Sequence, residues 1–315
     1  MEGGTAEWKG SGVPKARLSA LALLMALAAC TAEPAPSPSP SSVPSSTNEA
    51  ADQVYVSLGD SYATGYRPAT EDGPAGSTRD GFTDLVAART GLRLVNLACS
   101  GATSGQLRES TDCARANRAV GAPDPDGSTQ LAAAVRVLRE NEGRVGLVTV
   151  VIGGNDLTPC ARPATPAETF TCASEAVTTI RDNLAEVLPA LRAAAGDAPI
   201  VGLTYPDVFL GAWVSPEFPN GRDLARQSVP LFRDFFNTTL KAEYTAVDAT
   251  FVDVTAATGA YTALTDLTDD PAYGRIPTPV AKVCALTYFC AHTDVHPTPA
   301  GHEAIAAAVL TATGR

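Results

Sequence analysis

A Gly-Asp-Ser tripeptide at positions 59–61 directly follows the apolar run Val54–Leu58. A glycine at the end of a buried strand permits a sharp turn, and an aspartate after it can accept hydrogen bonds from nearby backbone amides. Such a turn would leave the Ser61 hydroxyl exposed, where it could act as a nucleophile. An ordinary strand-to-loop connection can contain the same residues, so the other parts of a catalytic site are needed to decide.

Two more loops of small residues follow predicted strands further along the chain. One contains Gly101, and the other is the run Gly153–Asp156. In an open parallel sheet, ligands bind outside the carboxyl ends of the strands, so we expect both loops to lie near Ser61. Backbone N–H groups and the Asn155 carboxamide could then stabilise a developing oxyanion beside the nucleophile.

A serine hydroxyl needs a general base, and the chain has three histidines. His296 precedes Pro297 just before the last predicted helix, which indicates a loop at the same edge of the sheet. His302 lies one turn into that helix, and we expect a surface or packing role for it. His292 lies close to a pair of cysteines, and we expect it to be structural or solvent-exposed. The sequence therefore favours His296 as the base.

Four short blocks occur in a fixed order along the chain: Gly59–Ser61, Asn96–Thr103, Gly153–Asp156 and His296–Pro297. In this order they resemble the SGNH/GDSL hydrolases, and most of all the secreted actinobacterial esterases and lipases of that family. The resemblance covers roughly residues 53–312 and implies a flavodoxin-like sheet and ester hydrolysis through an acyl-enzyme. It implies Ser61 as the nucleophile, His296 as the general base and an oxyanion hole from Ser61, Gly101 and Asn155. Such a mechanism needs no metal or organic cofactor.

One position departs from the family pattern. The family usually places an aspartate three residues before the histidine, where this chain has Thr293, and Asp294 lies one residue nearer. Either Asp294 reaches the His296 ring through a shift of the loop, or the Thr293 carbonyl accepts the hydrogen bond from Nδ1. We favour the carbonyl, because one step along an extended chain turns the side chain to the opposite face. On that interpretation Asp294→Ala would keep much of the activity.

Aromatic and apolar residues near the same edge are candidates for a substrate pocket. Tyr62 and Tyr66 flank the nucleophile, and Phe209, Leu210 and Trp213 follow the fourth predicted strand. An exposed apolar patch there would suit acyl chains. Ordinary packing under long loops would explain the same residues equally well.

Predicted strands and helices alternate, which indicates a three-layer α/β/α sandwich with a central parallel five-stranded sheet. The run 145–152 is apolar at nearly every position, as expected for a strand that is buried on both faces. Residues 255–295 are expected to be mostly irregular. The predicted strands are 54–58, 92–97, 145–152, 200–204 and 251–254, and the predicted helices are 81–90, 128–141, 174–195, 223–246 and 299–312.

The N-terminal region has the composition of an export signal. Basic residues precede the apolar run Leu18–Ala29, which is too short to span a bilayer, and Leu27–Cys30 resembles a bacterial lipobox. An ordinary signal peptide cut near Ala29 is the alternative. The residues after Cys30 are rich in proline, serine and alanine, as in an extended tether. We expect a lipoprotein signal peptide over 1–29, lipidation of Cys30, a disordered tether over 30–52 and the hydrolase domain over 53–315.

Six cysteines remain when Cys30 is set aside, and they form three couples that are local in the sequence. Six cysteines allow fifteen pairings, and the sequence alone does not choose among them. We expect local pairing, since each bridge would close one loop, and the spacing disfavours a metal site. Disulfides would place the chain in an oxidising compartment. The expected pairs are Cys99–Cys113, Cys160–Cys172 and Cys284–Cys290.

The formal net charge of −11 argues against a nucleic-acid partner and against attraction to anionic lipid. We expect a monomeric serine esterase or lipase that acts on a small-molecule or lipid ester and meets a membrane only through its N-terminal anchor. It would be an exported lipoprotein of the cell envelope or a secreted enzyme. The alternatives are a carbohydrate O-acetyl esterase of the same fold and a non-catalytic binding lipoprotein of the envelope.

Overall fold

A parallel sheet of five strands lies at the centre of the computed structural model, which describes residues 52–71, 73–161 and 166–315. The predicted signal peptide, Cys30 and the tether up to residue 51 lie outside the described residues. The strands follow the order β4-β1-β5-β6-β7, which is the 2-1-3-4-5 order of flavodoxin. All five predicted strands are present with slightly different ends: β1 (Val54–Gly59), β4 (Arg93–Asn96), β5 (Val145–Val151), β6 (Ile200–Leu203) and β7 (Thr250–Val252).

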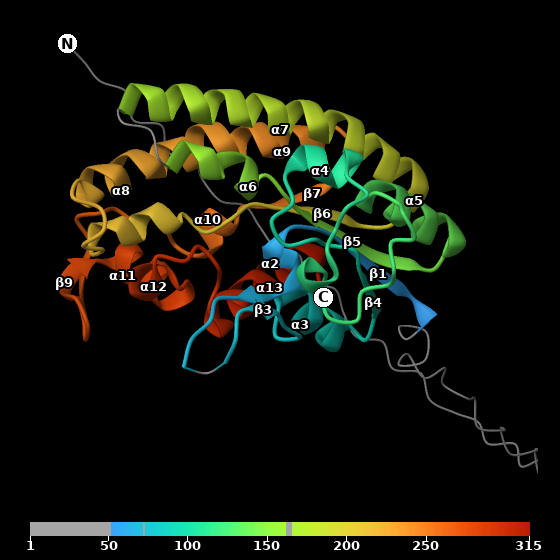
Figure 1. Cartoon of the computed structure of the whole chain (residues 1–315), viewed down its shortest axis with the longest axis horizontal. Helices are drawn as coiled ribbons and strands as arrows, with labels where there is room; N and C mark the ends of the chain where they lie inside the picture. The colour runs from blue at the N-terminus through green and yellow to red at the C-terminus, as the bar shows by residue number, and fades with distance from the viewer. Residues whose placement is uncertain (1–51, 72, 162–165) are drawn as a thin grey trace, which may run out of the picture. The chain divides into compact units, whose positions relative to one another are not determined.

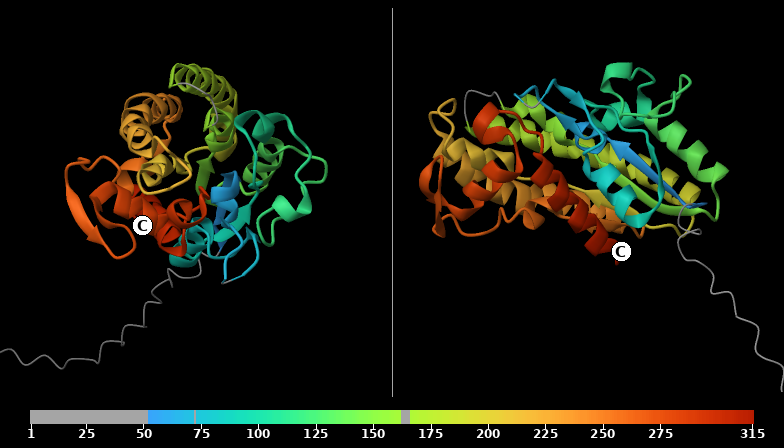
Figure 2. Two further views of the ribbon diagram at one scale, coloured as in Figure 1. Left: turned by 60° about the vertical axis from the view of Figure 1, so that its left-hand side comes forward. Right: turned by 90° about the horizontal axis from the view of Figure 1, so that it is seen from below.

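Helices cover both faces of this sheet, as Figures 1 and 2 show, and the predicted three-layer sandwich is confirmed. The helices α3 (Phe82–Thr90) and α13 (Pro299–Thr313) pack together on one face. The helices α5 (Gln130–Glu140), α7 (Pro166–Ala195) and α9 (Asn237–Thr245) pack together on the other. β1 is buried at all six positions, as is expected of a strand between two helical layers.

Two predicted elements differ from the structure. The helix expected to begin at residue 174 is longer, since α7 begins at Pro166. The helix expected over 223–246 is divided into α8 (Gly221–Pro230), a π-helical segment η4 (Leu231–Phe236) and α9. Pro230 has no N–H to donate, so the regular hydrogen-bond ladder is interrupted where η4 begins.

The segment 255–295 was expected to be mostly irregular, and this expectation was wrong. It contains the antiparallel hairpin β8 (Leu267–Asp270) and β9 (Gly274–Pro277), followed by α11 (Thr278–Leu286) and α12 (Phe289–His292). Figure 2 shows this hairpin projecting from the end of the fold that also carries α11. These elements are too short for a hydrophobic period to be recognised in the sequence.

Short elements connect the main ones, and the three predicted disulfides close loops among them. The pairs Cys99–Cys113, Cys160–Cys172 and Cys284–Cys290 are all formed, as predicted. Within the described ranges, no helix has both the length and the apolar character that crossing a bilayer requires. The short elements are α2 (Ser61–Thr64), β2 (Tyr66–Arg67), β3 (Gly76–Ser77), α4 (Ser104–Glu109), η1 (Arg115–Asn117), α6 (Gly154–Leu157), η2 (Thr158–Ala161), η3 (Val208–Trp213) and α10 (Val254–Ala257).

Candidate active site

The turn after β1 places Ser61 at the first position of α2. Gly59 has a φ of +139°, and a Cβ atom there would lie 2.1 Å from the Val151 carbonyl oxygen of β5, so only glycine fits. The Gln130 side chain forms two hydrogen bonds with the backbone of Gly59. Its Oε1 accepts from Gly59 N at 3.1 Å, and its Nε2 donates to Gly59 O at 3.0 Å. The turn is therefore fixed by the sheet and by a buried glutamine.

The structure brings His296 to Ser61 from the other end of the chain. His296 Nε2 lies 2.8 Å from Ser61 Oγ, which is a normal hydrogen-bond distance. The Tyr62 hydroxyl donates to the Val295 carbonyl oxygen at 2.5 Å, and the Tyr66 ring centroid lies 4.4 Å from that of His296. Tyr62 on α2 and Tyr66 on β2, which follow Ser61 in the chain, thus hold the His296 loop next to Ser61.

The Asp294 carboxylate, and not the Thr293 carbonyl, contacts the second nitrogen of the ring. Asp294 Oδ1 lies 2.7 Å from His296 Nδ1 and also accepts from the His296 backbone N–H at 2.9 Å. We had favoured the carbonyl by assuming an extended chain. Thr293 instead has a left-handed backbone, with a φ of +52°, so the chain turns and Asp294 reaches the ring.

The charges around His296 define the direction of its hydrogen bonds. Although burial raises the pKa of the Asp294 carboxyl, its hydrogen bonds with the side chain and the backbone N–H of His296 outweigh this and leave that pKa below its usual value. An ionised carboxylate only accepts hydrogen bonds, so Nδ1 carries the proton. Nε2 is then free to accept the proton of the Ser61 hydroxyl.

The expected oxyanion donors lie on the loops that follow β1, β4 and β5. Among the described residues, the backbone N–H groups of Ser61 and Gly101 have no hydrogen-bond acceptor. Asn155 Nδ2 donates to the Ala102 carbonyl oxygen at 2.9 Å, which ties the loop after β5 to the loop after β4. The three loops thus offer two free backbone N–H groups and one carboxamide, and the carboxamide also lies 3.5 Å from Asp60 Oδ2, next to Ser61 in the chain.

Two contacts in this region could not be found from residue types alone. The Tyr205 hydroxyl, just after β6, donates to Asp60 Oδ2 at 2.6 Å. The Asp156 carboxylate accepts from Ser104 N at 2.8 Å and from Ser104 Oγ at 2.7 Å. The one signal for Tyr205 in the sequence was its place at the carboxyl end of a predicted strand. Gln130 had no such signal, since it lies in a helix.

The predicted pocket residues have different surroundings. Tyr62 is only 4 % exposed and its hydroxyl is occupied by Val295, so it holds the loop and does not face a substrate. Leu210 is fully buried in the core. The Trp213 ring lies under two guanidinium groups, with Arg222 Cζ 5.5 Å and Arg226 Cζ 5.1 Å from its centroid. Tyr62, Leu210 and Trp213 therefore have packing roles.

Phe209 borders an apolar cavity of about 150 Å³ between α7 and the α8–η4 segment. Leu157, two residues after Asn155, belongs to the same wall. One further wall residue, Phe236, stacks against Tyr205 with ring centroids 6.4 Å apart. The Tyr205 ring thus contacts this wall through Phe236 and contacts Asp60, the neighbour of Ser61, through its hydroxyl.

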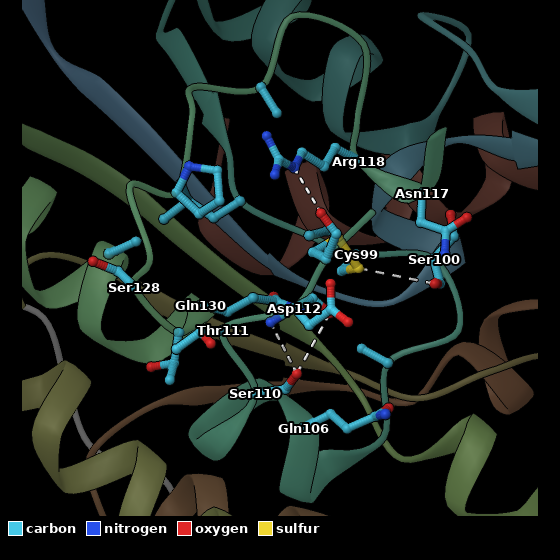
Figure 3. A pocket seen from close by; sticks show the side chains of 18 of the residues that line it. Cys99, Ser100, Gln106, Ser110, Thr111, Asp112, Asn117, Arg118, Ser128 and Gln130 are labelled. Atoms are coloured by element: carbon cyan, nitrogen blue, oxygen red, sulfur yellow. Dashed lines mark hydrogen bonds between the residues drawn. A yellow bond between two sulfur atoms is a disulfide. The ribbon is translucent and has the colours of Figure 1, made fainter. Parts of the chain in front are cut away.

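A second cavity, of about 230 Å³, borders the Gly101 loop (Figure 3). Its lining is about as apolar as it is polar, and it includes the Cys99–Cys113 disulfide and the Arg118 side chain. Arg118 Nε donates to the Cys113 carbonyl oxygen at 2.9 Å, and Gln130 is held by Gly59. Arg118 therefore stabilises the segment that the Cys99–Cys113 disulfide joins to the Gly101 loop, and Gln130 stabilises the neighbouring Gly59 turn.

The other two histidines do not take part in this site. His302 is buried, and its Nδ1 accepts from Phe82 N at 3.2 Å, while burial lowers the pKa of its imidazole to about 4. His292 is exposed. In the part of the chain that the structure describes, no cluster of three or more histidine, cysteine or acidic side chains could hold a metal ion.

Comparison with known proteins identifies the fold and the family. Two solved structures have the same fold as this chain, and their sequence identities are low enough that only the fold can be compared. An extracellular lipase from Streptomyces rimosus matches with 21 % identity and a TM-score of 0.52, covering 82 % of this chain and 99 % of that one. Phospholipase A1 from Streptomyces albidoflavus NA297 matches with 19 % identity and a TM-score of 0.50, covering 83 % and 99 %. No curated protein matches the chain. The model of the GDSL-like lipase/acylhydrolase family matches residues 57–304, and the chain therefore belongs to that family.

Proposed function

We propose that this protein is a serine esterase or lipase that hydrolyses carboxylic esters of acyl chains through an acyl-enzyme. The observation that carries the proposal is the continuous line of hydrogen bonds from Ser61 Oγ to His296 Nε2 and from His296 Nδ1 to Asp294 Oδ1. This is the arrangement in which a histidine removes the proton of a serine while a carboxylate holds the ring and stabilises its positive charge.

The reaction follows from these contacts in two halves. Ser61 Oγ attacks the ester carbonyl while His296 Nε2 takes its proton, and the N–H groups of Ser61, Gly101 and Asn155 stabilise the oxyanion. His296 then gives the proton to the leaving alkoxide oxygen, and the alcohol departs. Water, deprotonated by His296, attacks the acyl-enzyme and releases the acid, and the proton returns to Ser61.

The apolar cavity supports acyl chains longer than acetate. It borders Phe209, Phe232 and Phe236, and its wall continues to Leu157 beside the Asn155 loop. An apolar enclosure of this kind favours a hydrocarbon over a polar acyl group. The lipase and the phospholipase A1 that share the fold are consistent with this choice.

A carbohydrate O-acetyl esterase is the second candidate. The cavity beside Gly101 favours it, since part of its lining is polar, including Gln106 and Arg118, and hydroxyl-rich alcohols need polar partners. A non-catalytic binding lipoprotein has no such support, because the serine and histidine are aligned for proton transfer.

A panel of p-nitrophenyl esters from acetate to palmitate separates these functions, with Ser61→Ala as the control. We expect esters with medium or long acyl chains to be hydrolysed faster than the acetate ester. Ser61→Ala should abolish this activity. Turnover of acetate alone would favour the O-acetyl esterase, and no turnover of any ester would contradict an enzymatic function. Ala173→Leu, which fills the apolar cavity, should reduce activity on octanoate and leave acetate unchanged.

We further propose that the protein is exported, with Cys30 as its lipid anchor. The three disulfides support an oxidising compartment. Metabolic labelling with a fatty acid should mark the wild-type chain and leave Cys30→Ala unlabelled. Equal labelling of both chains would contradict the anchor.

A further inference from the structure

Asp60 lies beside the nucleophile but takes no part in the proton transfer described above. Its side chain is buried, with 1 % of the residue exposed. Oδ1 accepts from Tyr62 N at 3.0 Å, which caps α2, and Oδ2 accepts from the Tyr205 hydroxyl at 2.6 Å. Oδ2 also lies 3.5 Å from Asn155 Nδ2. This buried carboxylate therefore connects the nucleophile turn to an oxyanion donor.

The two N–H bonds of the Asn155 carboxamide have different partners. One donates to the Ala102 carbonyl oxygen at 2.9 Å, which is a normal hydrogen-bond distance. The other faces Asp60 Oδ2 at 3.5 Å, the outer limit of a hydrogen bond. Only this weakly engaged N–H can be redirected to the oxyanion of a substrate. Asp60 thus determines how available the donor is.

Tyr205 controls how strongly Asp60 attracts that donor. Burial raises the pKa of Asp60 to about 6, even though the hydrogen bonds from Tyr205 and from Tyr62 N lower it, so the carboxyl is ionised at neutral pH. An ionised carboxylate without the Tyr205 hydroxyl would hold the Asn155 N–H for itself, because hydrogen bonds to charged acceptors are the stronger ones. The short bond from Tyr205 takes up part of the negative charge on Oδ2, so this oxygen attracts the Asn155 N–H less strongly, and the contact between them is long at 3.5 Å.

The Tyr205 ring is held in one position by its neighbours. Its centroid lies 4.9 Å from that of Tyr62 in an edge-on contact and 6.4 Å from that of Phe236 in a stacked one. A Cβ atom on Gly154 would lie 3.0 Å from the same ring, so the Asn155 loop packs directly on it. The hydroxyl is thus aimed at Asp60 by packing on three sides.

We propose that Asp60 and Tyr205 form a positioning pair that leaves one N–H of the Asn155 carboxamide free for the oxyanion. The pair contacts neither the substrate nor the proton-transfer atoms, and it acts through Asn155. This inference rests on the proposed ester hydrolysis and adds two residues to its machinery. It predicts that the effect of the pair on catalysis depends on the presence of the Asn155 carboxamide.

The test is a double-mutant cycle on a p-nitrophenyl ester. Tyr205→Phe removes one hydroxyl and keeps the packed ring. We expect its kcat to fall about tenfold with KM nearly unchanged, which is less than the 10²–10³-fold typical of removing an oxyanion donor outright. In an Asn155→Ala background the same substitution should change kcat by less than about twofold, because the donor on which the pair acts is gone.

Asp60→Asn tests the other residue of the pair in the same cycle. It should lower kcat when Asn155 is present and leave kcat nearly unchanged in the Asn155→Ala background. The matched control is Tyr244→Phe. Tyr244 is equally buried, with its hydroxyl 3.4 Å from the Val150 carbonyl oxygen, and it does not contact Asn155. This control should leave kcat unchanged in both backgrounds.

The possible outcomes separate this inference from the proposed function. Equal losses of kcat in the two backgrounds, or no loss at all, would refute the positioning pair while wild-type turnover still supported an esterase. Absence of wild-type turnover on every ester would refute the proposed function itself. Thermal unfolding of each variant shows that the kcat values come from folded protein.

Discussion

The two sides of the candidate active site are built in different ways. Ser61 and the proposed oxyanion donors follow three adjacent strands, β4, β1 and β5, which parallel ladders hold side by side. His296 and Asp294 lie on the connection between α12 and α13, outside the sheet. That connection is held by the Tyr62 hydroxyl, by an isolated bridge between Thr287 and Pro297, and by the backbone bond from Tyr288 N to His296 O.

Because of this difference, we expect substitutions on one side to change mainly the stability of the fold and substitutions on the other to change mainly the rate of catalysis. The strand ends are part of the buried core, so a change in the backbone turns there, as distinct from a change in the reacting side chains, is expected to affect folding before it affects chemistry. The connection before α13 is held by a few single contacts, so a change there can move the base without unfolding the domain. The predictions below test this contrast, starting with the largest expected effect.

Removal of either partner in the central proton transfer should eliminate activity while the protein stays folded. Ser61→Ala and His296→Ala should each lower kcat by about 10⁵-fold or more, as in other serine hydrolases. The measurement is ester turnover with active-site titration, accompanied by circular dichroism. Retention of more than a thousandth of the activity by either variant would contradict the proposed roles.

Asp294→Asn keeps the shape of the side chain and removes its charge. Since Asp294 Oδ1 lies 2.7 Å from Nδ1, we expect kcat to fall by about 10⁴-fold, as when the aspartate of a serine-histidine-aspartate triad is changed to asparagine. This replaces the expectation from the sequence that Asp294→Ala keeps much of the activity. The Thr293 carbonyl would regain that role if Asp294→Asn and Asp294→Ala both retained at least a tenth of wild-type kcat.

On the sheet side, Gly59→Ala should act on folding. The new Cβ would lie 2.1 Å from the Val151 carbonyl oxygen, and the φ of +139° is unfavourable for alanine. We expect a loss of at least about 3 kcal/mol in the free energy of unfolding, as for strained backbone positions. Urea unfolding gives this value directly, and Gly314→Ala, at a helix end with open space around it, serves as the milder control.

On the base side, Tyr62→Phe should act on catalysis. Its hydroxyl donates to the Val295 carbonyl oxygen, and the loss of one such bond costs only about 1 kcal/mol of stability. We expect kcat to fall about tenfold because the His296 loop gains freedom and proton transfer depends on its geometry. If Tyr62→Phe lowered the free energy of unfolding by more than Gly59→Ala does, the contrast between the two sides would be contradicted.

The pH dependence of stability should differ in sign between the two sides. The pKa of Asp60 is raised by burial to about 6 from 3.8, so its folded form binds a proton more tightly than its unfolded form. Its contribution therefore favours folding at low pH and is lost as the pH rises through 6. The pKa of Asp294 is lowered, so its contribution is present above the unfolded pKa and is lost as the pH falls through the folded one.

Urea unfolding between pH 3 and pH 8 measures both contributions. Asp60→Asn should be less destabilising at pH 8 than at pH 5, and Asp294→Asn should be most destabilising at neutral pH. Asp207 also has a raised pKa, of about 7, because of its burial, so Asp207→Asn is needed to separate its contribution from that of Asp60. Parallel pH profiles for Asp60→Asn and Asp294→Asn would break the contrast.

The sheet side could be predicted in detail from the sequence. Each strand is a short apolar run that ends in glycine or small residues, and parallel strands necessarily bring such ends together. The burial of β1 and β5, the placement of Ser61, Gly101 and Asn155, and the local disulfides all follow from patterns within a few tens of residues. The base side could be predicted only in part, because one left-handed residue decides where Asp294 lies.

Residue types and their order were sufficient to predict the family and the parallel sheet, and to single out Ser61 and His296 as candidate site residues, since these depend on local patterns. Only the tertiary structure decided that Asp294 contacts the ring, that Tyr62 holds the histidine loop, and that Tyr205 meets Asp60. These contacts join positions far apart in the chain, and the backbone dihedrals between them are set by packing and not by the local residues. A change of one φ value at Thr293 is enough to exchange a carbonyl for a carboxylate, and no spacing rule contains that angle.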